Sequence, residues 1–210
     1  MKKTINIFGD ISSDTYWDDC ISAKMINDEL SGLTATDEIE ININSYGGEV
    51  FEAVAIASLI SNCPSNRVFN ILGICASAAT MLFDPKDKVF IHNGAMVMYH
   101  KPSTFMFGNS NDMRKTAALM DKMENETIIK NLSIRTGKTS DELTALITNE
   151  WWLTSDEAIS ELGFFAVDGK AIENKGKTKM TNIYKNYIER KKALTNSAFN
   201  RYINFKNSLK

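Results

Sequence analysis

A single serine, Ser77, lies within a run of very small residues at 73–80, with the sequence Gly-Ile-Cys-Ala-Ser-Ala-Ala-Thr. A stretch typical of a β-strand, 67–73, leads into this run. Small neighbours let the backbone turn tightly and leave space beside the serine oxygen for a substrate carbonyl. Two interpretations are open at this point. Ser77 is either a buried serine in a small-residue packing patch or a nucleophile on a sharp turn between a strand and a helix.

A serine nucleophile needs a base that takes its proton, and the chain has two histidines, His92 and His100. A lone histidine is often an ordinary core or surface residue. His100 is the better candidate because it ends an apolar, strand-like run at 95–100. It is followed by Lys101-Pro102, where a side chain can emerge at a sheet edge.

Attack on a carbonyl also needs donors for the developing oxyanion. Gly47-Gly48 could supply them, because this pair follows a strictly alternating strand-like run at 38–45 and precedes an apolar, helix-like run at 49–62. Glycines allow the main chain to approach a ligand closely. A Gly-Gly pair is equally typical of an ordinary turn.

The elements that would position these residues alternate between strands and helices, which favours a single α/β core. Capping residues frame one further helix, because Thr154 and Glu157 have capping-box spacing and Gly163 suits the position just past a helix end. The patterns predict strands at 4–9, 38–45, 67–73, 88–93, 95–100 and 164–167, and helices at 15–30, 49–62, 110–135 and 140–147.

Composition excludes several classes of function. The 210 residues are 43% hydrophobic, which suffices for one full core, and the net charge of −2 does not suggest a nucleic-acid or membrane role. We find no apolar run of membrane-spanning length and no secretory signal. Cys20, Cys63 and Cys75 have no metal-ligand spacing, so we expect no metal site and a reducing, cytoplasmic location. Cys75 is interpreted as a small buried hydrophobe.

The charge is unevenly distributed along the chain. Residues 174–210 contain ten Lys or Arg and one acidic residue, Glu189, so this segment is near +9 and residues 1–173 are near −11. We therefore predict a body at 1–173 and a basic tail at 174–210. Apolar residues recur in the tail at roughly helical spacing, which is typical of an amphipathic helix.

Four segments together, 43–53, 73–79, 98–102 and 135–169, resemble the proteolytic-subunit family of the Clp proteases (ClpP). More specifically, they resemble its phage branch, the head maturation (prohead) proteases. The resemblance covers residues 4–169. It implies a ClpP/crotonase-like α/β fold of repeated β-β-α units, to which the basic tail adds a C-terminal extension.

The resemblance also implies catalytic roles. Ser77 falls on the family's nucleophile and His100 on its general base. The backbone N–H groups of Gly48 and Ala78 fall on the oxyanion hole. The third member of the triad falls on Glu150.

Two positions depart from the family's pattern. The family usually has aspartate where Glu150 stands, although glutamate also serves as the orienting acid in serine hydrolases. Alternatively, Glu150 is a solvated acid and the triad is incomplete. Tyr46 stands where proline is usual. Substrate binding is expected at Gly47, Lys101 and Pro102.

These features predict a serine endopeptidase that works through an acyl-enzyme without a metal or other cofactor. Family members build homo-oligomeric rings, commonly heptamers that stack, and the helix at 110–135 with the segment before it (103–111) matches the region where such rings meet. The phage branch implies capsid or scaffold proteins as substrates, in the host cytoplasm or the assembling prohead. The first predicted strand begins at Thr4, which leaves too little chain for an unfoldase-contacting segment, so we expect cleavage without ATP.

Three alternatives stay open. The first is a housekeeping ClpP that works with an ATP-driven unfoldase. The second is a relative of the signal-peptide peptidases, but these use a Ser-Lys dyad, and His100 fits a triad better. The third is a crotonase-like acyl-CoA enzyme or a catalytically silent shell component on the same scaffold.

Overall fold

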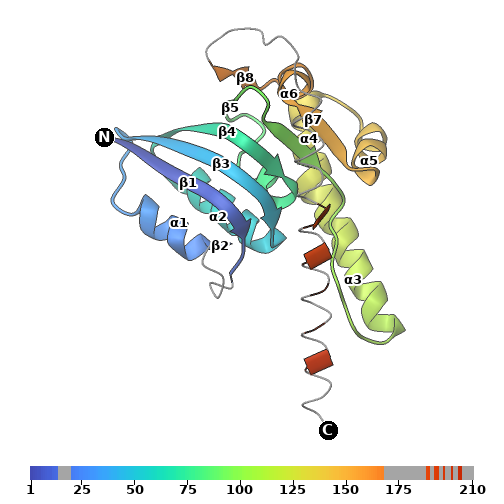
Figure 1. Ribbon diagram of the computed structural model, residues 1–210. Coiled ribbons are helices and arrows are strands. Elements are labelled where there is room, and N and C mark those ends of the chain that lie inside the picture. Colours follow the sequence, from blue (N-terminus) through green and yellow to red (C-terminus); the bar gives the residue numbers. More distant parts are fainter. Residues whose placement is uncertain are drawn as a thin grey trace.

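The strands of the described chain join into one mixed sheet (Figure 1). The computed structural model describes residues 1–13, 20–167, 188–189, 192–193, 196, 200 and 203–204. The main path of the sheet runs β2-β1-β3-β4-β5-β8, while β6 pairs with β4 and with β7. All of these pairs are parallel except β6 with β7. The strands are β1 (Lys2–Ile11), β2 (Cys20–Ile21), β3 (Glu38–Gly48), β4 (Asn66–Ala76), β5 (Val89–Ile91), β6 (Met96–Tyr99), β7 (Trp151–Thr154) and β8 (Phe165–Ala166).

The core lies between one face of this sheet and the helices. The alternating isoleucines of β3 are at most 1% exposed and pack with the buried residues of α1, α2, α4, α5 and α6. This confirms the α/β fold expected from the alternation of strands and helices. The helices are α1 (Ala23–Leu30), α2 (Val50–Asn62), the 3₁₀ helix η1 (Ser77–Met81), α3 (Ser110–Met123), the π-helical turn η2 (Glu124–Ile129), α4 (Lys130–Thr136), α5 (Ser140–Thr148) and α6 (Ser155–Leu162).

The long helix predicted at 110–135 is formed by α3, η2 and α4 in direct succession. Gly137 ends it in the left-handed region, with φ 73°. The π-helical turn begins at Glu124, a buried carboxylate whose Oε1 lies 3.0 Å from Lys101 Nζ. This ion pair ties the long helix to the segment that follows β6.

Helix α6 has the ends that the sequence predicts. The side chain of Thr154 accepts from the backbone N–H of Glu157, the carboxylate of Glu157 accepts from the backbone N–H of Thr154, and Gly163 has φ 66°. Residues 15–19 of the helix predicted at 15–30 lie outside the described residues, and the prediction was wrong at 20–22, because α1 begins at Ala23. Cys20–Ile21 instead pair with the end of β1, and Ser22 caps α1 by accepting from Met25 N.

The predicted boundary at 174 lies outside the described residues, as does most of the tail. The tail residues that the structure describes, Ile188–Glu189, 192–193, 196, 200 and 203–204, are helical. Within the described chain, each helix is too short or too polar to cross a bilayer.

Candidate active site

The sheet register brings three predicted residues to the same edge. Strands β4 and β6 are parallel, with Ala76 opposite Met98, so their carboxyl ends lie side by side. Ser77 and His100 directly follow these two strands. Strand β7 runs antiparallel to β6, so its first residue, Trp151, lies opposite Tyr99. Glu150, the residue just before β7, therefore reaches the edge where His100 begins.

The nucleophile candidate and the base candidate are in direct contact. Nε2 of His100 lies 2.6 Å from Oγ of Ser77, a hydrogen-bond distance suited to proton transfer between them. Ser77 has φ 56°, so the turn from β4 into η1 is sharp. The hydroxyl of Thr80 donates to the carbonyl oxygen of Ser77 at 2.6 Å and holds this turn. The other histidine, His92, follows β5.

The glycine pair at the end of β3 lies against the turn of the nucleophile. A Cβ atom on Gly47, which has φ 94°, would lie 2.6 Å from the carbonyl oxygen of Ala76 and 2.9 Å from Cβ of Ser77. No other residue fits this approach without moving the turn. Gly48 is held from the other side, because its neighbour Glu49 donates its N–H to the carbonyl of Ile11.

Two residues just before the glycine pair fix its course, and the sequence analysis missed both. The register between β3 and β4 shifts between Ile43 and Ser45. At this shift Asn44 Oδ1 accepts the N–H of Ile74 at 3.2 Å. Ser45 is fully buried, and its Oγ accepts the N–H of Gly47 at 3.1 Å. Asn and Ser within three residues before a Gly-Gly pair are a sequence signal for such side-chain-to-backbone turns.

The helix that begins at Ser77 is too short for its dipole to stabilise an oxyanion strongly. Ser77 begins η1, which is a 3₁₀ helix of five residues, Ser77–Met81. A macrodipole needs aligned peptides over several turns. Ala78, whose N–H is predicted to bind the oxyanion, is the second residue of this helix and is 2% exposed.

Glu150 is held in an unusual conformation. It has φ 57°, and together with Ser77 it accounts for the positive φ values of non-glycine residues in the described chain. Its Oε2 accepts from the indole N–H of Trp152 at 3.4 Å. Strained backbone at two positions of one site is typical of functional geometry.

The substrate-binding candidates lie around this centre. Gly47 lines the turn, and Lys101 is paired with Glu124 as described above. Pro102 follows and is half-buried. Tyr46, which replaces the expected proline, packs its ring against the cluster of Ile74, Ala76 and Met98.

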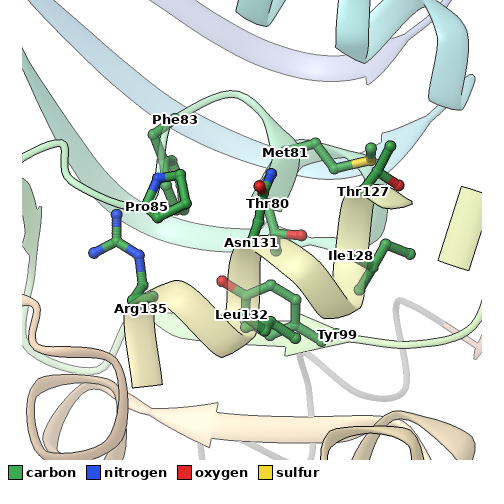
Figure 2. A pocket seen from close by; sticks show the side chains of 10 residues that line it. All are labelled: Thr80, Met81, Phe83, Pro85, Tyr99, Thr127, Ile128, Asn131, Leu132 and Arg135. Carbon is green, nitrogen blue, oxygen red and sulfur yellow. The ribbon is translucent and has the colours of Figure 1, made fainter. Parts of the chain in front are cut away.

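A small cavity is lined by residues from Thr80 onward in the chain, and Ser77 is not among them. It holds about 20 Å³ between the segment 80–85, Tyr99 of β6 and the long helix (Figure 2). This is room for about one water molecule. Arg135 closes one end, with its guanidinium stacked on Phe83 and Phe164. The cavity is a gap in the packing and too small for a peptide.

Cys75 does not compete with Ser77 as a nucleophile. It is fully buried, and burial raises the pKa of its thiol far above the ordinary range. A thiol that stays protonated is a poor nucleophile. Among the described residues, His, Cys, Asp and Glu side chains form no group of three or more that could hold a metal ion.

The chain is similar to known proteins in both sequence and fold. Residues 3–166 match the family model described as Clp protease. An ATP-dependent Clp protease proteolytic subunit 1 from Leifsonia xyli subsp. xyli is 31% identical over 146 residues, which are 69% of this chain and 72% of that protein. A proteolytic subunit 2 from Bifidobacterium longum is 30% identical over 147 residues, or 68% of this chain and 70% of that one.

A solved structure is similar in fold. A ClpP1 mutant from Listeria monocytogenes superimposes with a TM-score of 0.64, at 20% sequence identity, over 82% of this chain and 92% of that chain. At this identity the likeness concerns the arrangement of strands and helices.

Proposed function

Because the chain belongs to the Clp protease family, whose members are serine peptidases, we propose that it is a serine endopeptidase with Ser77, His100 and Glu150 as its triad. The observation that carries the proposal is the 2.6 Å contact between Ser77 Oγ and His100 Nε2 at the end of two paired strands. The same contact counts against a silent shell component, which would not need it.

The mechanism follows from the position of each group. His100 Nε2 takes the proton of Ser77 Oγ as this oxygen attacks the scissile carbonyl. The N–H groups of Gly48 and Ala78 hold the negative oxygen of the tetrahedral intermediate. His100 then gives the proton to the leaving amine, and an acyl-enzyme results. Water attacks that ester by the same route and restores Ser77.

The other two roles belong to the same proposal. Glu150 accepts from the second ring nitrogen of His100, which fixes the tautomer and stabilises the imidazolium that forms. Gly47, Lys101 and Pro102 border the bound peptide. The pairing of Lys101 with Glu124 anchors this border to the long helix.

A serine-directed probe tests the assignment. A fluorophosphonate should phosphonylate one serine oxygen with loss of HF, so the intact protein should gain the mass of one phosphonyl group. Ser77→Ala should abolish both this labelling and peptide cleavage. Ser58→Ala, on the surface of α2, is the matched control and should label normally. Labelling or cleavage that survives in Ser77→Ala would overturn the assignment.

Family members form oligomeric rings that act on protein substrates, and we propose a homo-oligomeric ring here as well. For the substrate we propose capsid or scaffold proteins of a phage prohead, cleaved without an ATPase. The support is the resemblance of segments 43–53, 73–79, 98–102 and 135–169 to the head maturation branch. The relatives named above are called ATP-dependent proteolytic subunits, which favours the housekeeping alternative.

One experiment separates these two functions. The purified protein is mixed with a scaffold-like substrate, with and without an unfoldase and ATP. A co-assembled protease meets its substrate at high local concentration, so cleavage should proceed without either addition. Cleavage that depends strictly on the unfoldase and ATP would favour the housekeeping function.

A further inference from the structure

The two faces of the sheet are covered differently. The helices place their buried side chains in the core on one face. On the other face, a row of asparagines crosses the middle of the sheet. The side-chain amide of Asn42 donates to Asn6, and that of Asn70 donates to Asn42, each at 3.0 Å. The centre of this face is therefore polar.

The same face becomes apolar and covered at its catalytic end. Ile74, Ala76 and Met98 are 4%, 0% and 0% exposed and form a cluster separate from the main core. By strand alternation, Ile74 and Ala76 project to the same side as Asn70. Three further side chains pack over the cluster: Tyr46, Trp152 and Ile188. We call Ile74, Ala76, Met98, Tyr46 and Trp152 the rear patch.

Ile188, which packs on this patch, comes from far along the sequence. It lies beyond the last strand, β8 (Phe165–Ala166), in the basic tail, whose described residues are red in Figure 1. The intervening chain of about 20 residues can span roughly 65 Å, so it places no constraint on where Ile188 docks. The tail and the body also carry opposite charges, near +9 and −11, which favour their association.

We propose that the chain's own C-terminal segment docks on the rear patch through Ile188 and braces the strands that carry the catalytic residues. Each strand contributes a contact beside its catalytic residue. Ala76 precedes Ser77, Met98 lies two positions before His100, and Trp152 lies two positions after Glu150. The indole of Trp152 donates to Glu150 Oε2, so packing on this ring acts on the orienting acid.

The proposal makes Ile188 a positioning residue. Its side chain reaches the catalytic groups only through the patch. A brace of this kind changes how well Glu150 and His100 are aligned, and catalysis is sensitive to misplacement of about 1 Å. The effect should therefore appear in kcat rather than in KM. This second half of the inference rests on the proposed peptidase function, whereas the docking itself does not.

Photo-crosslinking in the full-length chain tests the docking without reference to activity. A benzophenone amino acid at position 188 should crosslink to peptides containing Tyr46, Ile74–Ala76, Met98 or Trp152. The same probe at Ala193, which is exposed, is the matched control and should not reach them. Crosslinks from position 188 to other segments, or none, would overturn the docking.

Isotope mixing identifies the occupant of the patch. Unlabelled and ¹⁵N-labelled chains carrying the probe are combined before illumination. Crosslinked peptide pairs should then be entirely light or entirely heavy, because the segment docks within its own chain. Mixed pairs would assign the patch to the tail of a second copy and overturn the proposal.

Kinetics test the bracing. Ile188→Lys should lower kcat roughly tenfold with little change in KM. The conservative variant Ile188→Leu should keep a kcat close to that of the wild type. Ala193→Lys, at an exposed position, should have the wild-type kcat and KM. A wild-type kcat for Ile188→Lys would overturn the bracing. If the protein proves to be no peptidase, the crosslinks still decide the docking, so the two failures are distinguishable.

Discussion

Two of the three residues proposed as the catalytic triad have backbone conformations that are unfavourable for non-glycine residues. Ser77 and Glu150 have φ values of 56° and 57°, where a non-glycine residue costs of order 1–3 kcal/mol. Glycine would adopt the same positive φ at either position at a lower energetic cost. The proposed roles of the side chains account for a non-glycine residue at each position. Ser77 would be the nucleophile, and Glu150 would be the acid beside the strand of His100.

The first prediction at this scale concerns the acid. If Glu150 orients His100, Glu150→Gln should lower kcat by roughly 10²–10⁴-fold, because the amide no longer stabilises the imidazolium. KM should change little, since Glu150 does not bind the peptide. Steady-state kinetics measure both constants. Glu150→Asp, which restores the family's usual residue, is the control, and a wild-type rate for Glu150→Gln would assign the orienting role elsewhere.

A second prediction concerns the contact between Asn44 and Gly73. A methyl group on Gly73 would lie 2.6 Å from Asn44 Oδ1, and this oxygen also accepts the N–H of Ile74. Asn44→Ala should lower the free energy of unfolding by about 1 kcal/mol through the lost hydrogen bond. Gly73→Ala should lower it too, because the methyl displaces the amide.

The two changes should not add. In the double variant Asn44→Ala/Gly73→Ala, the added methyl has no amide to displace, so the cost of Gly73→Ala should largely vanish. Denaturant unfolding of the four proteins measures the coupling. Strict additivity would mean that the amide is not what excludes a side chain at position 73.

At the scale of elements, the sequence predicted the parts that a local pattern determines. The alternating isoleucines of β3 and the capping residues of α6 act within a few residues, and both elements form where expected. Trp151–Thr154 were missed as a strand because four residues beside a helix cap carry no period of their own. They become β7 only by pairing with β6. The pair Cys20–Ile21 likewise becomes a strand only through β1.

The same distinction applies to the site. Motif order predicted Ser77, His100 and the Gly47-Gly48 pair as parts of one site, and in the structure they lie close together. The contacts of Asn44 and Ser45 depend on a register shift between β3 and β4, and the packing of Ile188 joins distant segments. No local pattern encodes either, because both depend on the assembled sheet.

The contacts of Asp37 at the start of β3 should make the stability of the fold depend on pH. Asp37, just before β3, binds the amino group of Met1 and the side chain and N–H of Thr34, which lowers the pKa of its carboxyl to about 2. An acid with a depressed pKa stabilises the fold above its unfolded value near 4 and loses this contribution as the pH falls to about 2.

Thermal unfolding as a function of pH measures this effect. The wild-type protein should be stabilised over Asp37→Asn at neutral pH, and the difference in Tm should close between about pH 4 and pH 2. Asp10→Asn, a change at a carboxyl outside these contacts, serves as the control. A difference that stays constant across this range would show that the carboxylate charge of Asp37 does not contribute.

At the scale of the whole molecule, the first half of the long helix, α3, is accessible to solvent along its whole length. None of the side chains of α3 is buried, while Met113 and Leu119 are 51% and 48% exposed. Just before α3, the rings of Phe105 and Phe107 lie 4.6 Å apart and are also largely exposed. Apolar side chains grouped in this way mark an interaction surface. In a family that forms rings, the partner expected on this surface is another copy.

The last prediction follows from this surface. Leu119→Lys should reduce assembly to smaller species, because it places a charge where apolar side chains would be buried between copies. The fold itself should be unchanged, since α3 adds no side chain to the core. Light scattering after size exclusion measures the assembly, and circular dichroism measures the fold. Ala118→Lys, which adds the same charge at a neighbouring exposed position, controls for charge alone. If both variants assemble like the wild type, the copies meet through another surface, and the exposed half of α3 must serve a different partner.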